Sequence, residues 1–234
     1  EALLVAVGPA DGRSRVALLE ACAGPSADGA VRDAVALTFD DGEESCHRLI
    51  APLLERRNFR GDFFIVSRLI GTPGYLTAGQ VRELADRGHG IHSHSATHRF
   101  LTTMGRQEID DELAGSKEEI EAVSGRAVRF FSCPRGTYND LVLEAARRAG
   151  YERVLTSVEG YNAAGAPSGV LKRFAMRSYT TAAGLRRICE RHTATSCRLA
   201  AKHLALRTVK AVVPFERYDR WRSRMRVRAG FLTR

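Results

Sequence analysis

The stretch that decides the fold is Ala34-Val35-Ala36-Leu37-Thr38-Phe39-Asp40-Asp41-Gly42. Its first six residues form a short, mostly apolar run, which is typical of a buried strand in a parallel sheet. Asp40 and Asp41 therefore follow the strand at its C-terminal end, the end that carries the chemistry in α/β barrels, and Gly42 permits a sharp turn there. Because neighbours on an extended chain point in different directions, one acid can bind a metal while the other acts on a water. Such an acidic pair before Gly is also common in simple turns.

Histidines are concentrated in one short segment. Four of the seven lie within ten residues, namely His89, His92, His94 and His98, directly after a helical pattern that ends at Gly88. Since His94 and His98 are four residues apart, we expect them on one face of a helical turn, where a carboxylate from elsewhere completes a set of three ligands. Such a set leaves positions open for water and substrate. A pair at this spacing can arise by chance on a surface, but the concentration of histidines favours a metal site.

Strands and helices alternate along the middle of the chain. Strands are predicted at residues 34–39, 61–66, 89–93, 128–132, 152–157 and 171–177. The clearest helical pattern between them runs from Gln107 to Val123, and Asn139 is expected to cap the next helix, which ends at Gly150. This alternation predicts an α/β fold with parallel strands. A chain of 234 residues with 44% hydrophobic content can bury one substantial core.

Two of these motifs resemble those of a known family, the polysaccharide deacetylases of carbohydrate esterase family 4, also called the NodB-homology domain. Thr38-Phe39-Asp40-Asp41-Gly42 matches the first motif of that family in full, and Gly90-Ile91-His92-Ser93-His94-Ser95-Ala96-Thr97-His98 is similar to the second. The resemblance covers roughly residues 34–178. It implies a distorted (β/α) barrel of about seven parallel strands rather than eight.

The resemblance also implies a division of roles among the site residues. Asp41, His94 and His98 would bind a divalent metal, usually zinc and sometimes cobalt or nickel, and Asp40 would be the general base. A bound zinc lowers the pKa of its water from about 15.7 to about 7, so that this water can attack an acetamide carbonyl while the carboxylate accepts its proton. The expected activity is the hydrolytic removal of acetyl groups from N-acetylated sugars of a polysaccharide or a lipid-linked glycan.

The third motif departs from the family pattern. Phe131-Ser132-Cys133-Pro134-Arg135-Gly136 has Ser132 where many members have an Arg that steadies the base carboxylate. We expect Arg135 to substitute for that cation, and we expect Pro134, Arg135 and Gly136 to contact substrate. The family's oxyanion donor here is a backbone N–H, which survives side-chain replacement. The alternative interpretation is a simple loop with a surface Arg, and Cys133 is assigned to packing.

A second departure concerns the general acid. Many members carry a His in a Leu-x-His motif on a late strand, and no convincing equivalent is present. The late histidines, His192 and His203, lie in basic helical stretches and are expected to face solvent. Asp40 could return the proton it accepts and so serve as both base and acid. Two other functions stay open: a degenerate member that binds glycan without hydrolysis, and, less favoured by the order of the ligands, a non-haem iron oxygenase.

The basic charge is concentrated near the C-terminus. The net charge is +9, and residues 201–234 alone carry ten Lys or Arg against two acids, which is +8. We expect three segments: 1–33, formed by two short strands or a strand and a helix; the catalytic segment 34–178; and a basic helical extension, 179–234. Basic amphipathic helices suit anionic membrane surfaces, so residues 200–234 are expected either to contact a membrane or to dock their apolar positions on the barrel. No nucleic-acid partner is expected.

The cysteines and the start of the chain bear on its location. Five cysteines form no Cys-x-x-Cys pair, and the odd number argues against a complete disulfide framework, which favours a reducing compartment. No apolar run approaches the length that spans a membrane. These features favour the cytoplasm or the periphery of the inner membrane. The chain begins with Glu1 rather than Met, so we expect an upstream segment to be missing, and export stays open.

Overall fold

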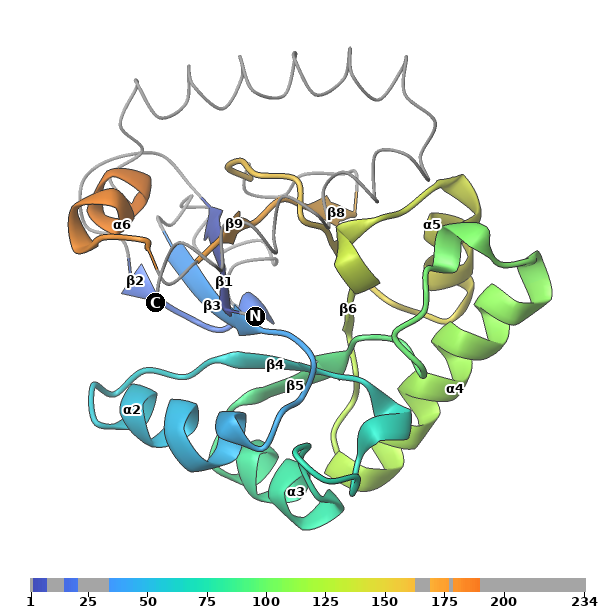
Figure 1. Cartoon of the computed structure of the whole chain (residues 1–234), viewed down its shortest axis with the longest axis horizontal. Helices are drawn as coiled ribbons and strands as arrows, with labels where there is room; N and C mark the ends of the chain where they lie inside the picture. The colour runs from blue at the N-terminus through green and yellow to red at the C-terminus, as the bar shows by residue number, and fades with distance from the viewer. Residues whose placement is uncertain (1, 8–14, 21–33, 163–168, 177–178, 190–234) are drawn as a thin grey trace, which may run out of the picture. The chain divides into compact units, whose positions relative to one another are not determined.

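The computed structural model describes residues 2–7, 15–20, 34–162, 169–176 and 179–189, and for residues 2–7 and Arg15 it describes the backbone alone (Figure 1). These ranges belong to one compact unit, residues 1–190. The expectations for residues 190–234, including those for His192, His203 and the membrane-contacting stretch, lie outside the described residues. Among the helices that are described, none has the length and apolar character needed to cross a membrane.

Six parallel strands form the body of the sheet. They are β3 (Ala34–Phe39), β4 (Asp62–Ile65), β5 (Gly90–Ser93), β6 (Phe130–Ser132), β7 (Arg153–Leu155) and β8 (Val170–Leu171). Each pairs in parallel with the next one along the chain, and together they curl into a half-barrel (Figure 1). The predicted α/β fold and its first five strand positions are confirmed. The predicted strand 171–177 is wrong as a single strand, because it is divided between the end of β8 and the antiparallel β9 (Phe174–Ala175). The count of about seven parallel strands stays a prediction.

The place beside β3 is taken by an antiparallel strand. β1 (Ala2–Val7) pairs with β3 in the register Ala2 to Phe39, and its other edge pairs with β9 (Phe174–Ala175), also antiparallel. The short β2 (Arg15–Val16) runs parallel to the first residues of β3. The described part of the N-terminal segment thus contains two short strands and, at Leu19 and Glu20, helical backbone.

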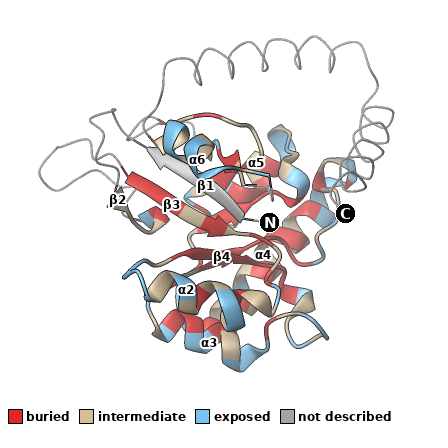
Figure 2. Cartoon of the chain, turned by 60° about the vertical axis from the view of Figure 1, so that its left-hand side comes forward, coloured by how far each residue is buried: buried red, intermediate tan, exposed pale blue. Residues whose placement is uncertain are grey.

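Helices cover the outer face of the half-barrel. α2 (Ala51–Glu55) continues the π-helical turn η1 (Cys46–Ile50), and α3 (Ala78–Asp86), α4 (Arg106–Ser124) and α5 (Asp140–Arg148) follow β4, β5 and β6. Other helical elements in the described residues include η2 (Ser67–Leu69), η3 (Leu101–Thr103), η4 (Pro134–Gly136) and α6 (Ala182–Cys189). Figure 2 shows buried residues on the faces of α2 and α3 that meet the sheet.

The ends of these helices follow from local sequence. Thr77 and Gln80 form a reciprocal capping box at the start of α3, and the Asn139 side chain accepts a hydrogen bond from the Val142 N–H at the start of α5. Gly125 ends α4 in the left-handed conformation, with φ of 66°. The predicted caps and ends of α4 and α5 are confirmed.

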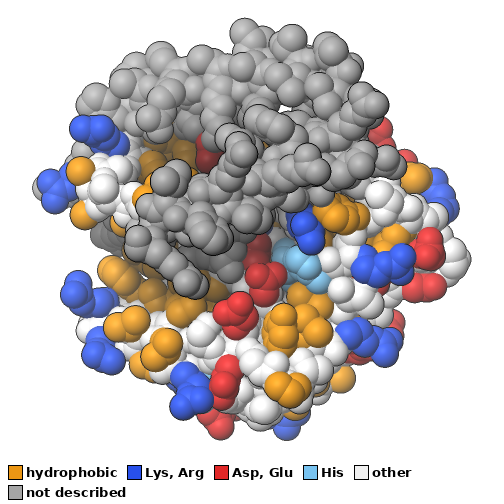
Figure 3. Space-filling model, in the orientation of Figure 1, with side chains coloured by type: hydrophobic (Ala, Val, Ile, Leu, Met, Phe, Trp, Pro, Cys, Tyr) orange, Lys and Arg blue, Asp and Glu red, His pale blue; other side chains and the backbone are white. Residues whose placement is uncertain are grey.

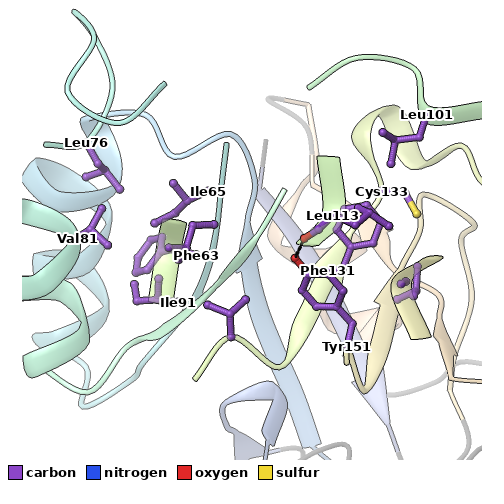
Figure 4. Close-up of a cluster of buried hydrophobic side chains, with 14 of the residues drawn as sticks. Phe63, Ile65, Leu76, Val81, Ile91, Leu101, Leu113, Phe131, Cys133 and Tyr151 are labelled. Carbon is purple, nitrogen blue, oxygen red and sulfur yellow. Dashed lines mark hydrogen bonds between the residues drawn. The ribbon is translucent and has the colours of Figure 1, made fainter. Parts of the chain in front are cut away.

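Alternate residues of the strands face two separate cores. Phe63, Ile65 and Ile91 point outward and pack with Val81 and other helix residues (Figure 4). The opposite faces of the same strands fill the interior of the half-barrel. That inner core contains Leu19, Ala34, Ala36, Phe64, Phe130, Leu155 and Leu171. Because both faces are buried, the strands are near-continuously apolar, which is why residues 34–39 are recognisable from sequence.

Two of the clustered histidines serve the fold. His92 lies inside the half-barrel between Phe64 and Phe130, and its Nε2 is 3.1 Å from Asp62 Oδ1. Asp62 also accepts a hydrogen bond from the backbone N–H of Leu19, so the pair ties the N-terminal segment to the sheet. His92 is therefore a core residue.

His89 belongs to an ion cluster at the N-terminal end of the parallel strands, just before β5. The Gly61 N–H donates to His89 Nδ1, so His89 Nε2 carries the proton and donates to Glu55, at 2.9 Å. Arg87 donates two hydrogen bonds of 2.8 Å to the Glu55 carboxylate. The cluster joins α2 to the residues between α3 and β5.

We expect this cluster to stabilise the fold only above acidic pH. The hydrogen bonds from Arg87, opposed by partial burial and supported by His89, lower the pKa of Glu55 from 4.5 to about 2. The stabilisation is therefore complete above about pH 4.5, where the unfolded chain is also ionised, and is lost as pH falls toward 2. Denaturant titrations from pH 6 to pH 2 should show a smaller loss of unfolding free energy for Glu55→Gln than for wild type. Glu118→Gln, on the exposed face of α4, is the control, and equal slopes for all three proteins would contradict the assignment.

Candidate metal and catalytic site

The polar residues predicted to form a site meet at one edge of the sheet. Asp40 and Asp41 follow β3, His94 and His98 follow β5, and Ser132 ends β6. Since the strands are parallel, their C-terminal ends lie side by side, and five residues far apart in sequence come together. Figure 3 shows histidine beside acidic side chains at the centre of one face of the molecule.

Asp41, His94 and His98 have the geometry of a metal-ligand set. One ligand atom from each lies within 4.8 Å of the others. The Nε2 atoms of both histidines are 3.5 Å from the same oxygen, Asp41 Oδ1. Ligands about 2.1 Å from a tetrahedral zinc ion are about 3.4 Å from one another, so these spacings fit such an ion. The donor set of two imidazole nitrogens and one carboxylate oxygen is one that zinc and its neighbours accept.

The surrounding groups hold the ligands in the required state. His94 Nδ1 donates a hydrogen bond of 2.7 Å to the Ser132 carbonyl, so the lone pair of His94 lies on Nε2, which faces Asp41. The neighbouring side chain of His94, opposed by partial burial, lowers the pKa of Asp41, and burial lowers the pKa of His98. Asp41 is thus ionised and His98 neutral, as metal binding requires.

The segment that carries the two histidines is not a helical turn, and that expectation was wrong. Ser95 and His98 have left-handed backbone conformations, with φ of 66° and 59°, which no helix accommodates. Buried Glu112 of α4 holds the loop by accepting the backbone N–H groups of Ala96 and Thr97, at 3.0 and 2.9 Å, and the Thr97 hydroxyl. The two imidazoles converge because of this loop.

Backbone strain is concentrated at the site. Asp41 and Arg135 have φ of 79° and 55°, and with Ser95 and His98 they make four of the five described residues other than glycine with positive φ. Each such conformation costs on the order of 1 kcal/mol or more and persists only where the surroundings enforce it. Two of the three candidate ligands, Asp41 and His98, are therefore held in place by the fold itself.

Asp40 is held by Arg173, not by Arg135. The guanidinium of Arg173 donates to both carboxylate oxygens of Asp40, each at 2.9 Å, in a bidentate pair. The side chain of Arg173 is 1% exposed and that of Asp40 is 7% exposed. The predicted substitution of the missing Arg by Arg135 is therefore wrong, because Arg173 already occupies the position beside the carboxylate.

Ser132 makes room for this arrangement and takes part in it. Arg173 donates to Ser132 Oγ at 2.9 Å, and Ser132 Oγ donates to Asp40 Oδ2 at 3.2 Å. The other two N–H groups of Arg173 reach the Thr156 carbonyl and Thr38 Oγ1. All five N–H donors of the guanidinium thus have acceptors, so this buried cation is fully satisfied.

The charge of Arg173 sets the ionisation of Asp40. Burial raises the pKa of Asp40, but the charges of Arg173 and His94 and the hydrogen bond from Arg173 outweigh it, and the net effect is a lowered pKa. Asp40 is therefore a carboxylate at neutral pH. Its Oδ2 accepts two of the hydrogen bonds above and its Oδ1 accepts one, which leaves Oδ1 with a lone pair for a further donor.

Arg135 lies at the rim of the site. Its guanidinium stacks over the ring of Phe100, 4.6 Å from the ring centre, and it is exposed. Pro134 and Cys133 beside it are buried. Burial raises the pKa of the Cys133 thiol to about 12, so the thiol is protonated and serves packing, as expected.

Arg173 could have been found in the sequence. Arg173 lies within the predicted strand 171–177, and a basic residue there is a candidate partner for an acid that lacks an Arg at position 132.

Comparison with known proteins identifies the family. The family model described as polysaccharide deacetylase matches residues 28–154, more than half of the chain. The chain therefore belongs to the polysaccharide deacetylases, and the resemblance noted in its sequence is confirmed.

Among curated relatives, the chain is 31% identical over 126 residues to the putative polysaccharide deacetylase YxkH of Bacillus subtilis, covering 54% of this chain and 45% of that protein. It is 32% identical over 124 residues to the peptidoglycan-N-acetylmuramic acid deacetylase PdaA of the same organism, covering 52% of this chain and 46% of that protein. The chain thus spans less than half the length of these two relatives.

Solved structures show the same fold. The deacetylase PplD of Streptococcus pyogenes aligns with a TM-score of 0.69 at 22% identity, covering 75% of this chain and 79% of that one. A de-N-acetylase from Aggregatibacter actinomycetemcomitans aligns with a TM-score of 0.66 at 20% identity, covering 76% of this chain and 84% of that one. These alignments place the half-barrel in the architecture of the deacetylases.

Proposed function

We propose that this protein is a metal-dependent hydrolase that removes acetyl groups from N-acetylated sugars of a polysaccharide or a lipid-linked glycan. The observation that carries the proposal is the convergence of Asp41, His94 and His98 on one point beside a buried, ionised Asp40. Membership of the polysaccharide deacetylases supports the reaction type. The names of the relatives, which include peptidoglycan and chitin deacetylases, support an acetylated glycan as substrate.

Asp41, His94 and His98 would hold the metal. Zinc suits the donor set, with cobalt or nickel as alternatives. A divalent cation at such a site polarises a carbonyl and lowers the pKa of a bound water from about 15.7 to about 7. The contribution of the chain is to keep three ligand atoms in place, with His94 fixed by the Ser132 carbonyl and the loop of His98 fixed by Glu112.

Asp40 acts as the general base. Its Oδ1 has the free lone pair, and the bidentate contact with Arg173 fixes the plane of the carboxylate. Asp40 would accept a proton from the attacking water at Oδ1 as the water adds to the acetamide carbonyl. Arg173 keeps Asp40 ionised beforehand and stays in contact with it while the proton is held.

The departing amine requires a proton. Among the described residues at the sheet edge, the two histidines are both metal-ligand candidates, and Arg173 is paired with Asp40. We therefore propose that Asp40 returns its proton to the amine and serves as both base and acid. A backbone N–H of η4, which is unaffected by the changed side chains, would donate to the oxyanion.

The alternative function is a degenerate member that binds glycan without hydrolysing it. This alternative is suggested by Ser132 and by the lack of a convincing Leu-x-His motif on a late strand. The bidentate Arg173–Asp40 pair argues against this alternative, because Arg173 gives Asp40 the guanidinium partner that Ser132 cannot provide. Contact of residues 200–234 with an anionic membrane, and a location in the cytoplasm or at the inner membrane, are further parts of the proposal.

Replacement of the ligands tests the metal site. Asp41→Ala, His94→Ala and His98→Ala should each weaken zinc binding by about 100-fold, because each removes one of three protein ligands from a preformed set. Metal content after dialysis against buffered zinc, with acetate release measured in parallel, checks this. His47→Ala, which removes a partly buried His paired with Glu83, is the control. A ligand variant that keeps stoichiometric zinc would remove that residue from the site.

A further inference from the structure

The guanidinium of Arg135 has no part in neutralising the base. Arg173 supplies the positive charge next to Asp40, so the charge of Arg135 at the rim is not needed to neutralise that carboxylate. Among the residues that the structure describes, Arg135 forms no ion pair with an acid. An exposed Arg without such a partner, next to a binding site, is available to a ligand.

Both the side chain and the backbone of Arg135 are held in place. Its side chain stacks on Phe100, which limits the freedom of the guanidinium. Its backbone, with φ of 55°, lies in the tight turn η4, closed by a hydrogen bond of 2.8 Å from the Gly136 N–H to the Cys133 carbonyl. A Cβ added at Gly136 would overlap Ser157, so the turn packs closely against the segment after β7.

This fixed guanidinium lies next to the proposed reaction centre. Phe100 is two residues beyond His98, and Arg135 is three residues beyond Ser132, whose carbonyl holds His94. A sugar whose acetamide reaches Asp40 and the ligands would therefore present its neighbouring substituents to Arg135 and Phe100.

A planar guanidinium that is held in place is suited to a carboxylate. Its N–H groups match the two carboxylate oxygens in a bidentate contact, a fit that a neutral hydroxyl cannot reproduce. Resting on the proposed function, we infer that Arg135 makes the site selective for N-acetylated glycans that carry a carboxylate within one sugar ring of the acetamide.

The test is a ratio of specificities. The probes are a neutral N-acetylglucosamine disaccharide, the same disaccharide with a lactyl ether carboxylate on the acetylated sugar, and a disaccharide in which a uronic acid neighbours N-acetylglucosamine. For wild type, kcat/KM should be about tenfold higher for at least one carboxylated probe than for the neutral one, the gain expected from one charged contact. Whichever acidic probe is preferred identifies the source of the carboxylate.

Variants of Arg135 separate recognition from catalysis. Arg135→Gln should bring the ratio of kcat/KM, carboxylated over neutral, close to one, and Arg135→Lys should give an intermediate ratio because it keeps charge without the planar fork. Arg126→Gln, which removes an exposed Arg beyond the end of α4, should leave the ratio unchanged. Calorimetric binding of the same probes should show the same order of affinities, independently of turnover.

The outcomes are distinguishable. A wild-type ratio near one, or a ratio that Arg135→Gln does not change, would overturn the inference while acetate release from the neutral probe upholds the proposed function. Acetate release from none of the probes, with no difference in binding between neutral and acidic probes, would overturn both.

Discussion

Asp40→Asn is expected to lower kcat for acetate release by about 10²–10⁴-fold while the protein keeps its metal. Asn has the shape of Asp but cannot accept the proton, and general acid–base catalysis contributes factors of this size. The proposal gives Asp40 two proton transfers, so the loss should lie toward the upper end. Asp41, His94 and His98 are untouched, and bound metal should stay stoichiometric.

The same substitution leaves Arg173 without its carboxylate. A buried cation that loses its partner destabilises a protein by about 3–5 kcal/mol. Unfolding measurements should therefore accompany the kinetics, so that a fall in kcat is counted only for folded protein. Metal lost together with activity would assign Asp40 to the ligand set instead.

Arg173→Ala is expected to lower kcat by about 10²–10³-fold and to destabilise the fold. Asp40 would stay buried without a counter-charge, so its pKa would rise and a smaller fraction would be ionised at neutral pH. The acid limb of the profile of kcat/KM against pH should accordingly move to higher pH. Arg148→Ala, which removes surface pairs with Asp110 and Glu144, is the control for a lost Arg.

A second variant distinguishes the loss of the Arg173–Asp40 contact from simple misfolding. Ser132→Arg combined with Arg173→Ala returns a guanidinium to the position on β6 where the family's third motif has one. This double variant should recover activity relative to Arg173→Ala alone, because the new guanidinium can pair with Asp40. An Arg173→Ala protein with wild-type kcat and an unshifted pH profile would show that Asp40 does not depend on the contact.

The parts of the fold that could be predicted from the sequence are those determined by residues close together in the chain. The apolar run of residues 34–39, the caps at Asn139 and Gly125, and the alternation of strands with helices follow from burial on both sheet faces and from local hydrogen bonds. The candidate metal ligands could also be predicted from sequence, because their motifs place Asp41 and the two histidines after predicted strands.

The contacts that escaped prediction are long-range. Arg173 reaches Asp40 across 133 positions of sequence, and no local pattern reports that its guanidinium is buried. The loop of His94 and His98 depends on Glu112 from the following helix, whose carboxylate replaces the helical hydrogen bonds that the spacing suggested. The antiparallel placement of β1 between β3 and β9 is likewise a matter of tertiary pairing.

The most direct test of the central claim is acetate release from an N-acetylated glycan oligomer by the wild-type protein, measured before metal removal, after chelation and after one equivalent of zinc or cobalt is returned. We predict release that disappears with the metal and returns with it. Release that is unaffected by complete removal of metal, or absent from every acetylated glycan tested at full metal occupancy, would contradict a metal-dependent deacetylase.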